Sequence, residues 1–372
     1  MRQRKHAPDF VLLVTVMLLL AVGLVMVYSA SEFVSRHSTK TVADPDGYSY
    51  FFARRQLSWV LIGLVALLLG MRINYWNLAK LSKLAFIVSI ILLLLVLIPG
   101  IGVERNGSRR WLGIGDQVLQ PSEIAKISLA FFLAKMMADK GKSMQSFHKG
   151  LLPCLLLTGL VCGLVVAEPD LGTAIAIFAV AAVMIFVAGA KWSHIIALGV
   201  LALAAVGLLV FTSDYRIDRL SFLNPWSDPT GDGFQLIQSF YALGPGGLFG
   251  RGLAQSIQKQ FYLPEPHTDF ILAIIGEELG FFGTSLVVLL FGVFIWRGFR
   301  IAMSAPDAFA SLLAVGMTTM VGLQAIINIA VVTGSIPTTG ITLPLISYGG
   351  SSLLFTMASI GVLLNVSKYV RE

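Results

Sequence analysis

One carboxylate of this chain lies where a long polar segment meets an apolar stretch. Asp269 belongs to residues 264–270 (PEPHTDF), directly before a hydrophobic run. A carboxylate at the start of a helix can serve simply as a cap for backbone N–H groups. At a boundary between lipid and water it can equally act as a general base or as a metal ligand. Asp269 is therefore a candidate catalytic residue, and the pattern alone leaves both interpretations open.

Two pairs of ionisable residues lie inside apolar stretches. Glu123 and Lys126 are three positions apart, so on a helix they share one face and can form an ion pair. An ionisable group within a membrane helix costs roughly 2.5–3.5 kcal/mol on insertion scales, so such groups usually face a cavity or a partner. A structural ion pair and a role in a binding site both remain open for this pair. Glu277 and Glu278 cannot both face lipid, so at least one is expected to complete an internal polar network.

Three arginines and one glycine-serine segment are candidates for binding an anion. Arg105, Arg109 and Arg110 lie close together in one polar loop, and the guanidinium fork suits phosphate oxygens. Contact with lipid headgroups in a solvated loop is the alternative for each of them. Residues 347–352 (SYGGSS) open the last apolar stretch, after a segment interrupted by prolines. Free N–H groups at a helix start attract anions, and interrupted membrane helices often form substrate sites, although a plain helix cap would give the same pattern.

The composition shows what kind of elements must position these residues. Of 372 residues, 56% are hydrophobic and only 13% are charged, and the mean hydropathy is +0.82. Soluble domains are about a quarter charged, so the excess of apolar side chains must face lipid. The net charge of +7 does not indicate a nucleic-acid partner, because the basic residues lie singly in loops, where they meet anionic membrane lipids. Cys154 and Cys162 share one apolar stretch and are expected to be buried thiols, neither a disulfide nor a metal site.

Ten stretches are candidates to cross the membrane, since a crossing takes about 20 mainly apolar residues. They cover roughly residues 9–30, 57–71, 84–100, 123–139, 151–167, 171–189, 194–212, 269–296, 308–333 and 347–367. The predicted fold class is therefore all-α, a polytopic membrane protein that forms a single domain, 1–372, with both termini on the same side. The basic start of the chain resembles a signal peptide, but its apolar run is too long for one, so it is expected to remain as an anchor.

The loops differ between the two faces of the membrane. With the N-terminus in the cytoplasm, the short inner segments hold more of the lysines and arginines that govern orientation. The outer segments, 31–56, 101–122 and above all 213–268, are long and rich in proline, glycine and aromatic residues. The working face is therefore expected to be extracytoplasmic. The sequence contains no Walker loop, and the glycine-rich residues 244–252 are interpreted as a flexible turn instead of a phosphate cradle.

Several long motifs together resemble one known family. They are residues 106–111 (NGSRRW), 120–123 (QPSE), 168–173 (EPDLGT), 224–235 (NPWSDPTGDGFQ), 258–280 (QKQFYLPEPHTDFILAIIGEELG) and 328–352, which ends in LPLISYGGSS. In this order, and over essentially the whole chain, they are similar to the FtsW/RodA/SpoVE family of shape, elongation, division and sporulation (SEDS) proteins. NPW and YLPEPHTDF look more like the division and sporulation branch than the elongation branch. Ser335 departs from the aliphatic residue expected at its position.

The resemblance implies a peptidoglycan glycosyltransferase of the bacterial cytoplasmic membrane. Its substrate would be lipid II, a disaccharide-pentapeptide on undecaprenyl pyrophosphate, and its partners a class B penicillin-binding transpeptidase and the division or sporulation machinery. Asp269 matches the family's essential aspartate and is expected to activate the acceptor hydroxyl, with a divalent cation such as Mg²⁺ or Mn²⁺ as an additional expectation. The residues expected to bind or shape the substrate site are Arg105, Arg109, Arg110, Glu123, Lys126, Lys259, His267, Ser347, Gly349, Gly350 and Ser351.

Two other functions are compatible with a protein of this kind. A lipid II flippase, also proposed for this family, needs a site that can be reached from both leaflets. The inner loops are short and plain while the outer ones are elaborate, which favours the enzyme. A purely scaffolding division protein would leave Asp269 and the arginines without a role.

Overall fold

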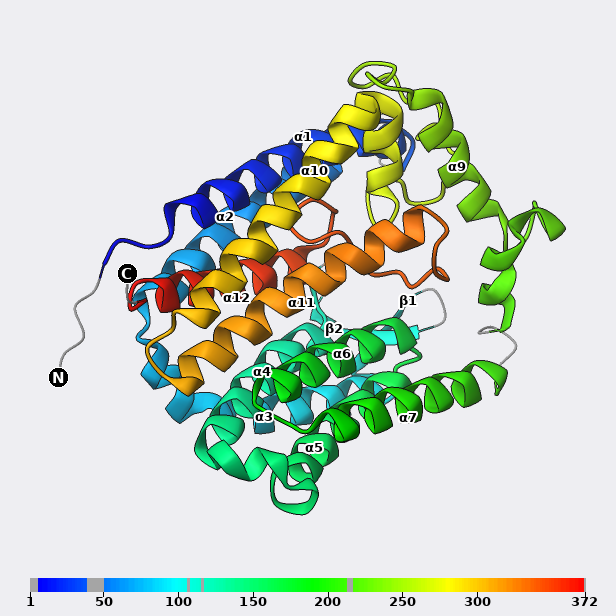
Figure 1. The fold of residues 1–372 in the computed structure, drawn as a ribbon. Coiled ribbons are helices and arrows are strands. Elements are labelled where there is room, and N and C mark those ends of the chain that lie inside the picture. Colours follow the sequence, from blue (N-terminus) through cyan, green and yellow to red (C-terminus); the bar gives the residue numbers. More distant parts are fainter. Residues whose placement is uncertain (1–5, 39–49, 106–107, 115–116, 213–216, 371–372) are drawn as a thin grey trace.

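The chain folds into a bundle of membrane-spanning helices (Figure 1). The structure, a computed structural model, describes residues 6–38, 50–105, 108–114, 117–212 and 217–370. Eight of the described helices are long and apolar enough to cross a membrane, and α4 and α6 coincide with the two remaining predicted stretches. The helices are α1 (Phe10–Ser38), α2 (Phe51–Arg72), α3 (Tyr75–Leu97), α4 (Pro121–Lys140), α5 (Leu152–Ala167), α6 (Leu171–Val187), α7 (Trp192–Phe211), α9 (Phe234–Gly246), α10 (Ile271–Met303), α11 (Ala308–Val332) and α12 (Gly350–Ser367). The predicted polytopic helical fold is confirmed.

The helices form two groups that α11 joins. In Figure 1, α3 to α7 make up the lower part, whereas α1, α2, α10 and α12 make up the upper part. α11 packs against α10 and α12 on one side and against α4 and α6 on the other. α2 and α12 cross closely, since a Cβ atom on Gly361 would lie 2.4 Å from the carbonyl oxygen of Leu67. Small residues of this kind allow membrane helices to approach closely.

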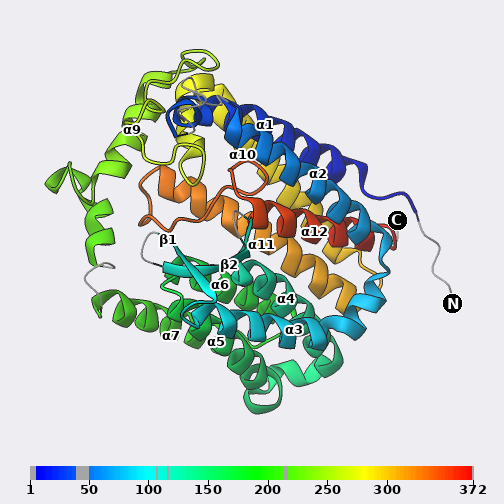
Figure 2. The same ribbon diagram turned by 180° about the vertical axis from the view of Figure 1, so that it is seen from behind.

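The loop expected at residues 101–122 contains a small sheet, which the sequence analysis did not predict. Strands β1 (Gly102–Arg105), β2 (Ser108–Ile114) and β3 (Gln117–Leu119) pair antiparallel in the order β1-β2-β3. β3 contacts α12, so the sheet lies close to the start of the last helix (Figure 2). Because successive side chains of a strand point to opposite faces, neighbouring arginines on β2 must face different surroundings.

The long segment before α10 contains regular elements where the structure describes it. It contains two short 3-10 helices, Arg219–Leu223 and Pro225–Ser227, followed by α9. Its glycine-rich part is not a free turn. A Cβ atom on Gly250 would lie 2.1 Å from the carbonyl oxygen of Glu278, so the glycines are needed for close packing against α10.

α10 is broken where this segment packs against it. Gly280 has φ 66° and ψ −160°, which interrupts the helix between two helical parts. The break exposes the last carbonyls of the first part, and the N–H groups of Arg251 and Gly252 donate to the carbonyl oxygens of Glu277 and Glu278 at 2.9 and 3.0 Å. The part of α10 before Gly280 and residues 246–252 therefore pack together as one unit.

The two ends of the described chain meet at the other end of the bundle. The side chain of Arg297 pairs with Asp9, whose backbone N–H donates to the hydroxyl of Ser367 at 3.0 Å. His6 N–H also donates to the carbonyl oxygen of Lys368 at 2.9 Å. The described residues near both termini thus lie on one side of the bundle, as an even number of crossings requires.

The orientation in the membrane can be tested by labelling. Lys142 and Asp232 are both exposed, and they lie in segments predicted to face opposite sides. After Cys154 and Cys162 are replaced, Lys142→Cys should react only with a cytoplasmic thiol reagent and Asp232→Cys only with an external one. Reaction of both cysteines from the same side of intact cells would contradict the ten-helix topology.

Candidate active site

Charged residues of both signs line one cavity at the end of the bundle where the long loop lies. The cavity has a volume of about 570 Å³ and is bordered by α2, the small sheet, α4, the start of α6, the segment before α10, α11 and the start of α12. Its charged lining residues are Arg55, Arg110, Glu123, Lys126, Asp170, Arg219, Glu265 and Asp269. Cations and carboxylates in one enclosed space are suited to bind a charged substrate and to transfer a proton.

Asp269 lies in the turn that precedes α10 and faces this cavity. The Thr268 hydroxyl lies 3.1 Å from Asp269 Oδ1 and 3.4 Å from Glu265 Oε2. The pKa of Asp269 is raised to about 6, mainly by burial and also by Glu265, against the opposite effects of Thr268 and Arg219. The N-cap position of α10 is Phe270, which provides no side-chain cap. The geometry therefore favours a chemical role for Asp269 over a capping role.

Glu123 and Lys126 form an ion pair and also line the cavity. Lys126 Nζ lies 2.8 Å from Glu123 Oε1, and the two residues are 6% and 7% exposed. Pro121 starts α4 directly before them, which places Glu123 in the first turn, where a negative charge suits the helix dipole. The predicted ion pair is therefore present and borders the cavity, and its role in a binding site stays a prediction.

The neighbouring arginines on β2 have separate environments. Arg110 lines the cavity, where its guanidinium donates to the carbonyl oxygens of Glu168 and Pro169 and lies 3.7 Å from Asp170 Oδ2. Arg109 instead pairs with Glu104 on the adjacent strand at 2.9 Å, in an exposed position outside the cavity. The side chain of Arg105 lies outside the described residues.

The turn that anchors Arg110 holds a buried acid. The Glu168 side chain is fully buried, and neither of its carboxyl oxygens has a hydrogen-bond partner among the described residues. Burial and the nearby Asp170 raise the pKa of Glu168 to about 8, against the opposite effect of Arg110. This carboxyl is therefore mostly protonated at neutral pH and adds little charge to the site.

The start of α12 borders the cavity as expected, but not through every predicted residue. Gly349, Gly350 and Ser351 line it. Ser347 lies behind it and supports the turn, since its Oγ accepts from the N–H of Leu343 at 2.8 Å and its carbonyl oxygen accepts from Gln56 at 3.2 Å. The predicted anion site at this helix start therefore depends on residues 349–351.

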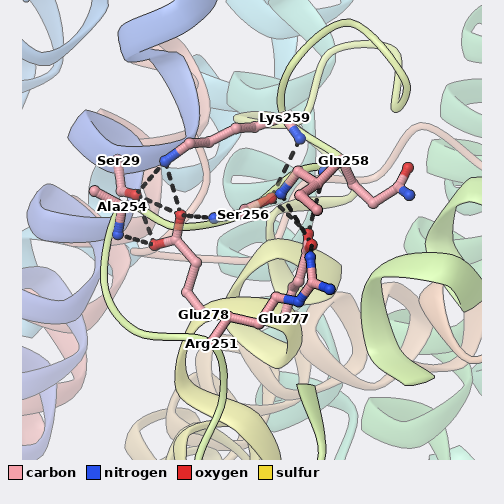
Figure 3. A network of polar contacts seen from close by, with 9 residues as sticks. Ser29, Arg251, Ala254, Ser256, Gln258, Lys259, Glu277 and Glu278 are labelled. Carbon is pink, nitrogen blue, oxygen red and sulfur yellow. Dashed lines mark hydrogen bonds and ion pairs between the residues drawn. The ribbon is translucent and has the colours of Figure 1, made fainter. Parts of the chain in front are cut away.

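Lys259 belongs to a buried network away from the cavity (Figure 3). Its Nζ lies 2.9 Å from Glu278 Oε1 and 3.2 Å from the hydroxyl of Ser29 on α1. Glu278 also accepts from the N–H groups of Ala254 and Ser256 at 3.0 and 3.3 Å. The structure corrects the expectation that Lys259 binds substrate, because its charge is already neutralised inside the protein.

The adjacent glutamate extends the same network. Glu277 accepts from the Ser256 hydroxyl at 2.5 Å and from the N–H groups of Ile257 and Gln258 at 2.9 and 3.3 Å, and it lies 3.5 Å from Arg251 (Figure 3). The prediction that at least one of the two glutamates completes a polar network is confirmed, and both do so. Their carboxylates hold residues 251–259 against α10.

His267 is also placed away from the cavity. Its ring lies among those of Phe52 and Tyr348, with ring centroids 4.5 and 5.5 Å away, and burial lowers its pKa to about 4. A neutral, aromatic-packed histidine supports the turn before Asp269 and offers no charge to a phosphate. The expectation that it binds substrate is corrected for that reason.

Four charged residues of the cavity were not singled out in the sequence. Arg55 comes from the start of α2, Asp170 from the N-cap of α6, Arg219 from the first 3-10 helix, and Glu265 from the turn before Asp269. Asp170 and Glu265 could have been noticed, since they belong to the EPDLGT and PEPHTDF motifs. The sequence positions of the two arginines alone give no comparable signal.

Charge exchange tests the pairing of Glu123 with Lys126. Glu123→Ala or Lys126→Ala leaves one buried charge uncompensated, which should lower the free energy of unfolding by roughly 3–5 kcal/mol. The double exchange Glu123→Lys with Lys126→Glu should recover part of this loss, because it restores an ion pair. The recovery should be incomplete, because the helix dipole disfavours lysine in the first turn. Thermal unfolding in detergent measures both effects. A double exchange no more stable than the single variants would show that direct pairing is not their role.

Comparison with known proteins identifies the relatives of this chain. The model of the FtsW/RodA/SpoVE family, described as cell cycle proteins, matches residues 10–372. Stage V sporulation protein E of Bacillus subtilis (strain 168) is 50% identical over 372 residues, which is 100% of both chains. The probable peptidoglycan glycosyltransferase FtsW of Geobacter sp. (strain M18) is 42% identical over 370 residues, which is 99% of each chain.

Solved structures of similar chains show the same fold. A chain from a study of the structural coordination of polymerization and crosslinking by a peptidoglycan synthase complex gives a TM-score of 0.78 at 34% identity, covering 97% of this chain and 98% of that one. The crystal structure of the rod shape determining protein RodA of Thermus thermophilus gives 0.70 at 29% identity, covering 98% of each. The higher identity to the sporulation protein and FtsW confirms the predicted branch. By its motifs, its fold and its full-length match, this protein belongs to the FtsW/RodA/SpoVE family of cell cycle proteins.

Proposed function

We propose that this protein is a peptidoglycan glycosyltransferase that polymerises lipid II at the outer face of the bacterial cytoplasmic membrane, during division or sporulation. The observation that carries the proposal is Asp269, a partly buried carboxylate in a cavity that it shares with several cations and with the start of α12. The identity of 42% to a probable peptidoglycan glycosyltransferase supports the reaction class. Both termini are then cytoplasmic, and membrane lipids surround the helices.

In this proposal Asp269 acts as the general base. It accepts the proton of the acceptor sugar's hydroxyl, whose oxygen forms a bond to the anomeric carbon of the donor sugar. The bond from that carbon to the pyrophosphate oxygen breaks, with inversion at the carbon, and its electron pair leaves with the lipid pyrophosphate. Because burial raises the pKa of Asp269 to about 6, the group is a stronger base than an exposed aspartate and is still ionised at neutral pH.

The leaving pyrophosphate needs positive charge and N–H donors. Arg110, from the small sheet, and Arg219, from the first 3-10 helix, both line the cavity, and the ion pair of Lys126 with Glu123 shapes its wall from α4. The first residues of α12, through Gly349 and Gly350, contribute the positive end of a helix dipole to the same space. In this proposal the two arginines and the helix start stabilise the negative charge that develops on the leaving pyrophosphate.

The oxygen atoms around Asp269 are suited to a divalent cation such as Mg²⁺ or Mn²⁺. The carboxylates of Asp269 and Glu265 both approach the hydroxyl of Thr268. Mg²⁺ is commonly held by one or two carboxylates, with water and substrate phosphates completing its ligands. The described residues contain no group of three or more His, Cys, Asp or Glu side chains that could hold a metal alone, so the pair would bind the ion together with the substrate. A bound cation neutralises charge on the leaving pyrophosphate.

The expected partner is a class B penicillin-binding transpeptidase that crosslinks the new strands. A structurally similar chain comes from a peptidoglycan synthase complex in which polymerization and crosslinking are coordinated, which supports this expectation. The rival function, transport of lipid II, requires a path to both leaflets. The charged cavity residues instead come from one end of the bundle, which favours polymerisation.

Asp269→Asn tests the catalytic assignment. The substitution keeps size and hydrogen-bonding capacity but removes the base, so polymerisation of labelled lipid II should fall at least roughly 10²-fold. The variant should accumulate in the membrane normally. Asp232→Asn, an exposed change in the same long segment, is the matched control and should polymerise like the unaltered protein. Near-normal polymer from Asp269→Asn would refute the assignment, whereas normal lipid II transport with polymerisation lost would count against the flippase.

The pH dependence of the rate gives a second test. The base must be ionised, and burial raises the pKa of Asp269 to about 6, so activity should be full above this value and decline as the pH falls through about 6. An aspartate with an ordinary pKa near 4 would keep the activity down to about pH 4. Initial rates between pH 4 and 8 distinguish the two. An acid limb near 4 would show that the cavity does not perturb the base.

A further inference from the structure

The side chain of Asn328 connects the backbone of Asp269 to a neighbouring segment of the cavity wall. Asn328 lies on α11 and is 0% exposed. Its Nδ2 donates to the backbone carbonyl oxygen of Asp269 at 2.6 Å and to that of Ile341 at 2.9 Å. Both neighbours are acceptors, so the amide nitrogen and not the oxygen must face them. The orientation of this side chain is therefore fixed by its partners.

The carbonyl of Asp269 takes a side chain as its partner because α10 begins just after it. At the start of α10, the N–H of Ala273 donates to the carbonyl oxygen of Phe270, which is the N-cap residue. The turn has one further backbone tie to the cavity wall, from the N–H of Tyr348 to the carbonyl oxygen of His267 at 2.9 Å. Asp269 itself is thus attached to the helical frame through Asn328.

The second partner of Asn328 also belongs to the cavity. Residues 339–342 line it, and Ile341 is among them. This segment has no helical hydrogen bonds of its own, and the N–H of Ile341 makes only a long contact of 3.4 Å to the Thr339 hydroxyl. The amide group of Asn328 therefore ties the backbone of Asp269 directly to segment 339–342.

We propose that Asn328 is a positioning residue for the glycosyl transfer: by holding the Asp269 and Ile341 carbonyls together, it fixes the Asp269 carboxylate relative to the bound sugar. This inference rests on the proposed role of Asp269 as the base. Displacement of a catalytic group by about 1 Å can lower a rate by about 10²-fold, so removal of the amide should affect turnover more than substrate binding.

The chain offers a matched control for this substitution. Asn365 on α12 is 2% exposed, and its Nδ2 donates to the carbonyl oxygen of Met71 at 2.7 Å. The Oδ1 atoms of Asn328 and Asn365 both have no hydrogen-bond partner among the described residues. Asn365 is therefore a buried asparagine of the same kind, but it lies at the end of the bundle away from the cavity.

The experiment compares Asn328→Leu with Asn365→Leu in the full-length chain. Leucine has a similar size and cannot donate a hydrogen bond, so both variants should lose thermal stability to a similar degree. Asn328→Leu should polymerise lipid II with a kcat at least about tenfold lower and a KM within about threefold of the unaltered protein, as expected for a misplaced base. Asn365→Leu should keep kcat within about twofold.

Other results would overturn the inference. Equal loss of kcat in both variants would reduce Asn328 to a structural residue, and an unchanged kcat in Asn328→Leu would remove its role altogether. If Asn328→Leu does not accumulate, Asn328→Ser and Asn365→Ser take the place of the leucine pair, with the same outcomes decisive. Activity of Asp269→Asn would refute the proposed base itself, whereas inactive Asp269→Asn with normal Asn328→Leu would refute the positioning role alone.

Discussion

Lipid offers a buried polar group no hydrogen-bond partner, and this constraint governs where the charges of the protein can lie. Glu123 is neutralised by Lys126 on the same helix, and Glu278 by Lys259 from the segment that packs beside it. The second pair also includes Ser29, so it joins α1 to α10 and to the long loop. Satisfying these charges therefore fixes the relative positions of elements that are far apart in the chain.

Within the cavity, the same constraint sets Asp269 apart. The carboxylate of Glu123 has a lysine at 2.8 Å, and that of Asp170 has Arg110 and the hydroxyl of Thr173. Asp269 has the hydroxyl of Thr268 and a more distant arginine, and a neighbouring glutamate opposes its ionisation. In the proposed mechanism the base has to remain incompletely compensated until the acceptor hydroxyl arrives. The contact from Asn328 suits this requirement, because it anchors the backbone of Asp269 and does not engage its carboxylate.

Much of this arrangement could be predicted from the sequence, and the remainder depends on long-range contacts. The membrane stretches follow from the length of apolar runs, a local property, and the motif around Asp269 identifies the cavity. The sheet within 101–122 was not predicted, because its strands have only four, seven and three residues. Lys259 belongs to the same motif as Asp269, yet its ion pair with Glu278 places it beside α10 and outside the cavity. Arg55 and Arg219 reach the cavity only through tertiary folding.

The hydrogen bonds to Glu277 and Glu278 also restrict the length of the segment formed by residues 251–258. Most surface loops accept insertions at small entropic cost. Here, two backbone carbonyls and two carboxylates of α10 accept hydrogen bonds from the N–H groups of residues 251, 252, 254, 256, 257 and 258. One added or deleted residue would shift the following N–H groups away from their acceptors and leave buried carboxylates unsatisfied. The segment can therefore vary in its exposed side chains, but its length is set by the spacing of oxygen atoms on one helix.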